Sequence, residues 1–91
     1  MDKCYIIMYD LIAPGRNYQG LYDAIKSYKK WGKLTESCWA IVTTSSAVEI
    51  RNYLQCFMDN NDRLMIIKGG GEAAWRNMMA DSQWLKQHLA L

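Results

Sequence analysis

The residue whose position most suggests chemistry is Asp10, which directly follows the apolar run 4–9. A carboxylate loses solvation at the end of a buried strand, so an acid in this place needs a reason. One reason is metal binding, because Mg²⁺ prefers oxygen ligands, keeps several waters and needs only one or two carboxylates. In a twofold dimer, two Asp10 side chains could share one ion that activates water against a phosphodiester. The alternative is that Asp10 only caps the turn after the strand.

Basic side chains form the second group of interest. Arg16 follows a Pro-Gly turn at 14–15, and its guanidinium could bind a phosphate through two hydrogen bonds. Four lysines fall close together: Lys26, Lys29, Lys30 and Lys33. They could contact the phosphates of RNA or DNA. Alternatively, Arg16 is an ordinary surface residue and the lysines are the solvated face of a helix. A net charge of +2 is low for a dedicated nucleic-acid binder.

Three further features have weaker links to chemistry. The glycines at 69–71 resemble a phosphate cradle, but no phosphate-binding motif around them is complete, which favours a joint between segments. His88 has no visible acid or nucleophile partner for general-base chemistry. The three cysteines lack a CxxC or Cys/His spacing, which argues against a zinc site and fits a reducing cytoplasm.

The elements in the first half of the chain must position Asp10 at a strand end. The run 4–9 is short and rich in β-formers, so it predicts a strand that is buried on both faces. From Asn17 onward the apolar residues follow helical spacing. Gly32 is placed to end this helix, and 33–43 predicts two short strands.

The second half of the chain repeats the helix-strand alternation. Residues 46–49, Ser-Ala-Val-Glu, form a capping box that begins a second helix. The polar run 59–62 ends that helix, and 64–67 predicts another buried strand. Beyond the glycines, apolar spacing predicts a helical tail over 69–91, with Ser82 as the cap of its last turn.

The order β-α-β-β-α-β plus a tail predicts one α+β domain over 1–91. Its expected form is ferredoxin-like: an antiparallel sheet with two helices on one face, a core at 1–68 and a helical tail. The composition is 51% hydrophobic, more than a chain of 91 residues readily buries, so a homodimer interface is expected. The absence of a signal pattern and of a long apolar run predicts a cytoplasmic protein without a membrane span.

The strand Tyr5-Ile6-Ile7-Met8-Tyr9-Asp10-Leu11 resembles the first strand of the CRISPR-associated "Cas-two" family, small ferredoxin-like homodimers. In that family the strand also ends in a Tyr-Asp-hydrophobe step. The resemblance continues at 21–32, 36–39 and 62–68. The virulence-associated protein D family shares the first-strand pattern. The sequences at 72–75 and 84–86 look like those of a bacterial group often labelled SinR-like.

This resemblance implies a Mg²⁺-dependent endonuclease of RNA or DNA, foremost an endoribonuclease, with Asp10 as the catalytic and metal-binding residue. It also implies the alternative of a non-catalytic homodimeric scaffold. That family usually carries an Arg cluster after the Asp, where this chain has only Arg16, and it ends in a strand where this tail is predicted to be helical. Both differences argue against an integrase-type partner. A small-ligand sensor is a third interpretation, which is supported by 69–71 alone.

Overall fold

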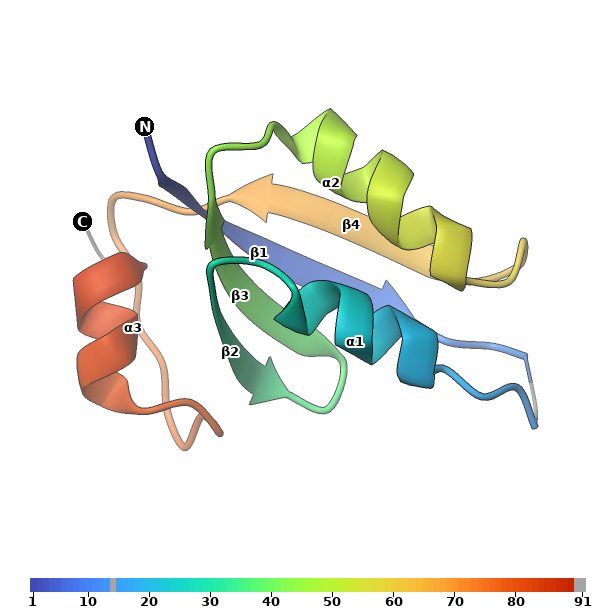
Figure 1. Cartoon of the computed structure of the whole chain (residues 1–91). Helices are drawn as coiled ribbons and strands as arrows, with labels where there is room; N and C mark the ends of the chain where they lie inside the picture. Colours follow the sequence, from blue (N-terminus) through green and yellow to red (C-terminus); the bar gives the residue numbers. More distant parts are fainter. Residues whose placement is uncertain (14, 90–91) are drawn as a thin grey trace.

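The computed structural model describes residues 1–13 and 15–89, so Pro14 of the predicted turn lies outside the described residues. A four-stranded antiparallel sheet in the order β2-β3-β1-β4 forms the centre, and α1 and α2 cover one face of it (Figure 1). The elements are β1 Lys3–Asp10, α1 Gln19–Lys26, β2 Lys30–Thr35, β3 Cys38–Thr43, α2 Ala47–Leu54, a 3₁₀ turn Gln55–Phe57, β4 Arg63–Lys68 and α3 Ser82–His88. The predicted α+β class is confirmed. Among the described residues, no helix has the length and apolar character that a bilayer crossing requires.

Strand β1 runs through the middle of the sheet and alternates between its two faces. The side chains that face α1 and α2 are all buried: Tyr5, Ile7 and Tyr9. On the opposite face, Cys4 and Ile6 pack into a second apolar cluster beneath the C-terminal tail. Met8 and Asp10 share this face but are exposed. The prediction of burial on both faces therefore holds only for the first part of the strand.

Helix α2 begins with the predicted capping box. The Ser46 hydroxyl oxygen accepts from the backbone N–H of Glu49 at 3.2 Å, and the Glu49 carboxylate accepts from the backbone N–H of Ser46 at 2.8 Å. These hydrogen bonds from Ser46 lower the pKa of Glu49. The helix then buries Ile50 and Leu54 against the sheet. Local sequence therefore determined where α2 starts and which side faces the core.

The C-terminal tail differs from the prediction. Among the described residues of the tail, Ser82–His88 is helical and residues 69–81 form no helix, while residues 90–91 of the predicted tail lie outside the described residues. The N-cap is Asp81, whose carboxylate accepts from the backbone N–H of Trp84 at 3.4 Å, so the prediction that Ser82 is the cap was wrong. The tail crosses the second sheet face and buries Leu85 completely in the cluster beneath it.

Gly32 also differs from the prediction, because it lies inside β2 instead of ending α1. Helix α1 ends at Lys26, with Ser27 as its C-cap. A Cβ atom built on Gly32 would lie 3.3 Å from Cζ3 of Trp84 and 3.5 Å from the Cβ of Ala80. The glycine therefore lets the tail approach the sheet closely.

Candidate functional site

The Tyr9-Asp10 step places two neighbouring side chains on opposite faces of the sheet. The Tyr9 hydroxyl accepts from Trp39 Nε1 at 2.8 Å and donates to the Glu36 carbonyl oxygen at 3.2 Å. Burial raises the pKa of Tyr9, which keeps the phenol protonated. Tyr9 therefore fixes the end of β1 in the core, while Asp10 faces outward.

Asp10 lies directly opposite Arg63, the first residue of β4. Arg63 Nη1 donates to the Asp10 carboxylate at 2.7 Å, and the two side chains are 71% and 64% exposed. An exposed ion pair of this kind contributes about 0–1 kcal/mol, so another cation can displace Arg63 at little cost. Within residues 1–13 and 15–89, the Asp10 carboxylate accepts no hydrogen bond from the following turn, so the predicted capping role is not seen.

An apolar surface adjoins this ion pair on the same face of the sheet. It consists of Met8, Met65 and Ile67, which are 38%, 53% and 46% exposed, and we call it the open face. Met8 lies opposite Met65 in the register of β1 and β4. A shallow pocket of about 320 Å³ reaches from these methionines to Asp10 and Arg63. The open face is thus an apolar patch with one acid and one base at its end.

The donor chemistry of Asp10 suits Mg²⁺, which binds oxygen ligands and keeps several of its waters. One protomer contributes a single carboxylate here, and no group of three or more His, Cys, Asp or Glu side chains in the described part of the chain is arranged to hold an ion. A metal site at Asp10 would therefore need a second ligand from a partner subunit or from substrate.

The four predicted lysines do not form one surface. Lys33 pairs with Glu36 at 3.5 Å and its ammonium lies 5.5 Å from the Trp39 ring centroid, on the helix side of the sheet. Lys26 lies 5.4 Å from the Trp31 ring on that side. Lys29 pairs with Asp2 at 3.1 Å, and Lys30 points to the opposite sheet face, because its register partner is Val42. The predicted phosphate-binding patch is therefore divided between two faces.

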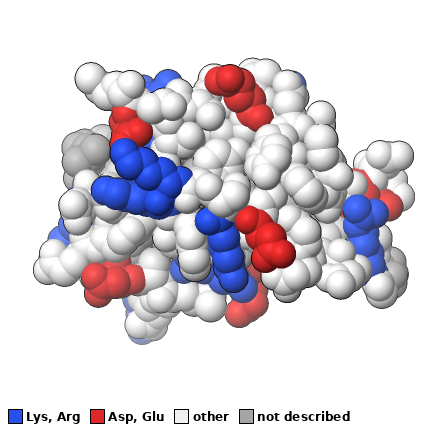
Figure 2. All heavy atoms as spheres, in the orientation of Figure 1, with Lys and Arg blue, Asp and Glu red and all other residues white. Residues whose placement is uncertain are grey.

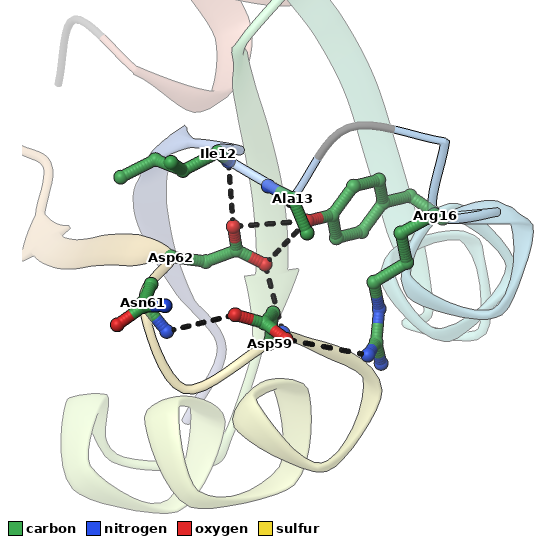
Figure 3. A network of polar contacts seen from close by, with 7 residues as sticks. Ile12, Ala13, Arg16, Asp59, Asn61 and Asp62 are labelled. Atoms are coloured by element: carbon green, nitrogen blue, oxygen red, sulfur yellow. Dashed lines mark hydrogen bonds and ion pairs between the residues drawn. The ribbon is translucent and has the colours of Figure 1, made fainter.

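Arg16 belongs to a polar network that sequence reasoning missed (Figure 3). Its guanidinium lies 3.9 Å from the Asp59 carboxylate and 5.5 Å from the Tyr18 ring centroid. At the centre is Asp62, which accepts from the backbone N–H groups of Ile12 at 2.7 Å and Asp59 at 2.8 Å, and from the Tyr18 hydroxyl at 2.7 and 2.9 Å. The only sequence signal for Asp62 was its place in the polar run 59–62.

These hydrogen bonds make Asp62 a structural carboxylate. Burial alone would raise the pKa of Asp62, but the donors on Ile12, Tyr18 and Asp59 outweigh it and lower the pKa below the usual value of 3.8. The charged form therefore ties the loop after β1 to the loop before β4.

Replacing Asp62 by Asn is expected to lower the melting temperature at pH 7, because an amide NH₂ cannot accept the hydrogen bond that Asp59 N–H donates. The folded-state pKa of Asp62 is depressed, so its stabilisation exists above the unfolded pKa and is lost as the pH falls through the folded pKa. The difference between wild type and variant in circular-dichroism melting should shrink below about pH 4. Asp23→Asn, on the exposed side of α1, is the control, and an equal effect of both variants would contradict this role.

Comparison with known proteins adds no family to this picture: no protein-family model matches the sequence, and no solved structure matches the chain. The strand that ends in Tyr9-Asp10 also forms one side of the open face, so Asp10 is the acid at which the chemistry of that face is concentrated.

Proposed function

We propose that this protein is a ferredoxin-like homodimer that processes nucleic acid, foremost as a Mg²⁺-dependent endoribonuclease with Asp10 at its centre. The ferredoxin-like assignment is supported by the strand order β2-β3-β1-β4. In that order β3 separates β1 from β2, and β1 separates β3 from β4, which is the arrangement of two interleaved split βαβ units. The single observation that carries the functional proposal is the apolar open face ending at Asp10 and Arg63.

The open face favours a second copy of this chain as its partner. Met8, Met65 and Ile67 lie half-exposed together, and full burial of such a side chain contributes about 1.5–3 kcal/mol. In a twofold interface the same patch faces itself, so one acid and one base at its end are self-complementary. Asp10 of one protomer can then approach Arg63 of the partner subunit, or Asp10 of the partner subunit.

The proposed chemistry follows from this pairing. Two Asp10 carboxylates across the twofold axis would provide the one or two oxygen ligands that a hydrated Mg²⁺ requires. When bound, the ion would supply an activated water and stabilise the charge that develops on a phosphodiester. Arg63, released from its ion pair, could donate two hydrogen bonds to a substrate phosphate.

The test is cleavage of labelled single-stranded RNA and DNA by the purified protein. We expect RNA to be cut in the presence of Mg²⁺ and to stay intact with EDTA. Asp10→Asn should reduce cleavage to the background without protein, while light scattering still shows a dimer, because the amide is a poorer ligand of similar shape. Asp23→Asn should cut like wild type. Equal cleavage by Asp10→Asn would exclude Asp10 as the catalytic residue.

A non-catalytic homodimeric scaffold is the second candidate, and the ion pair itself favours it. The Asp10 carboxylate is held by Arg63 at 2.7 Å, and in the described part of the chain it belongs to no group of three or more His, Cys, Asp or Glu side chains that could hold an ion. If this pair serves assembly, the wild-type protein leaves RNA and DNA intact and Asp10→Asn weakens the dimer. The same two measurements therefore separate the candidates.

A further inference from the structure

A second pocket, of about 350 Å³, lies at the opposite end of β1 from Asp10. Its lining includes Lys3 at the start of β1, Lys30 at the start of β2 and His88 at the end of α3. At about 3.3 Å per residue, the seven steps along β1 place Asp10 roughly 23 Å from Lys3. This pocket is therefore separate from the open face and from the chemistry proposed there.

The pocket lies beside three lysines: Lys3, Lys30 and Lys68. Lys30 points to the sheet face that carries the tail, whereas Lys3 and Lys68 lie on the helix side, by alternation along β1 and by the register of β1 and β4. Within the described ranges 1–13 and 15–89, none of the three ammonium groups has a carboxylate oxygen within 4.0 Å. Among the described residues, the one acid in the lining is Asp2, which pairs with Lys29 at 3.1 Å. Figure 2 shows basic side chains, with an acidic one beside them, near the end of the molecule where Figure 1 places both chain termini.

The loop after β4 adds a fixed backbone wall. Gly69 N–H donates to the Cys4 carbonyl oxygen at 2.8 Å, which ties the loop to β1. A Cβ atom at Gly69 would lie 2.9 Å from Cδ1 of Leu89, so a larger residue would require the Leu89 side chain to shift. Gly70 lines the pocket with a φ of 136°, and its N–H has no acceptor in the described part of the chain. This N–H is available to a bound anion.

The pKa of His88, which lines the pocket, responds to the charge inside the pocket. Its ring lies 4.6 Å from the Trp84 ring, and burial together with the nearby Lys30 lowers the pKa of His88. The other charged groups around the pocket are Lys3, Lys68 and Asp2. An anion placed among these groups would offset the repulsion from Lys30 and favour the protonated imidazole.

We propose that this pocket binds a phosphate-type anion, either free phosphate or the phosphate monoester of a nucleotide. Lys30 and protonated His88 would supply charged donors and Gly70 a backbone donor, the combination that phosphate groups find in proteins. A volume of about 350 Å³ is at the lower end of small-molecule sites and suits a ligand of at most nucleotide size. The proposal is independent of nuclease activity at Asp10.

The test uses His88, the single histidine of the chain, as a proton NMR probe. Inorganic phosphate should raise the pKa of His88 in a saturable way at constant ionic strength, whereas chloride should not. Lys30→Gln should raise the phosphate concentration at half-saturation by about fivefold to tenfold. Lys3 is left intact because its ammonium lies 5.8 Å from the Tyr5 ring, on the helix side of the sheet. Lys86→Gln, on the exposed side of α3, is the matched control and should bind like wild type.

The outcomes are distinct. If adenosine 5′-monophosphate reaches half-saturation at a concentration at least about tenfold below that of phosphate, the ligand is a nucleotide. If both reach half-saturation at the same concentration, the pocket recognises the phosphate group alone. The proposal would be overturned if the pKa of His88 showed no saturable shift with phosphate. It would also be overturned if Lys86→Gln weakened phosphate binding as much as Lys30→Gln, because general screening of charge would then explain the effect.

Discussion

Replacing Leu85 by alanine is expected to lower the free energy of unfolding by about 3 kcal/mol. Leu85 is fully buried, and it is the residue of α3 that enters the second apolar cluster most deeply, against Leu34, Ala40 and Val42. The truncation would remove this contact and leave a cavity under the tail. Small domains have a total stability of only about 5–15 kcal/mol, so this loss would be a large fraction.

Urea unfolding followed by circular dichroism measures this effect. Gln87→Ala, on the exposed side of the same helix, is the control and should stay within about 0.5 kcal/mol of wild type. Because His88 follows Leu85 by less than one turn, the Leu85 variant should also disturb the NMR signal of His88. A loss below about 1 kcal/mol would mean that the tail is not part of the cooperative core.

The tail shows where local sequence stops being informative. The apolar residues over 73–78 have a spacing that imitates a helix, yet residues 69–81 cross the sheet without forming one. Their apolar side chains Trp75 and Met78 pack on the second cluster. Gly32 was misassigned for the same reason, since its role depends on Trp84, which is far away in sequence. Apolar spacing predicts burial better than it predicts the backbone conformation that achieves it.

The lysines illustrate the consequence for a candidate site. When Gly32 is taken as the end of a helix, Lys26, Lys29 and Lys30 share one helical surface with Lys33 just beyond it. In the structure β2 begins at Lys30, and strand residues alternate between faces with a period of two. Lys30 and Lys33 therefore face opposite sides of the sheet. An error in one element boundary was enough to predict a phosphate-binding patch that the fold divides.

Strong local signals, by contrast, gave correct predictions. The capping box at Ser46 needs only four consecutive residues, and the strand 4–9 needs only its apolar run. Asp62 carries no such signal, because its partner Tyr18 is 44 residues away. Only the folded chain brings the two together, so a carboxylate of this kind is found from structure and not from spacing.

Replacing Met65 by lysine is expected to convert the proposed dimer into a monomer, with the dissociation constant raised at least about a thousandfold. Met65 lies in the middle of the open face, 53% exposed and opposite Met8. In a twofold interface each variant chain brings the same new charge, so two unpaired ammonium groups would be buried near one another, which costs several kcal/mol. The monomer should fold normally, because an exposed substitution changes stability by about 0.5 kcal/mol or less.

Analytical ultracentrifugation measures the dissociation constant, and Val48→Lys, a substitution of an exposed apolar residue on α2, is the control that should remain dimeric.

The Met65 variant also links assembly to chemistry. If two Asp10 carboxylates act across the twofold axis, cleavage should fall in proportion to the dimer, although Asp10 itself is intact. Phosphate binding observed at His88 should be unchanged, since that pocket lies at the other end of β1. A Met65 variant that stays dimeric would place the interface elsewhere, and a monomer that still cuts RNA would show that one Asp10 suffices.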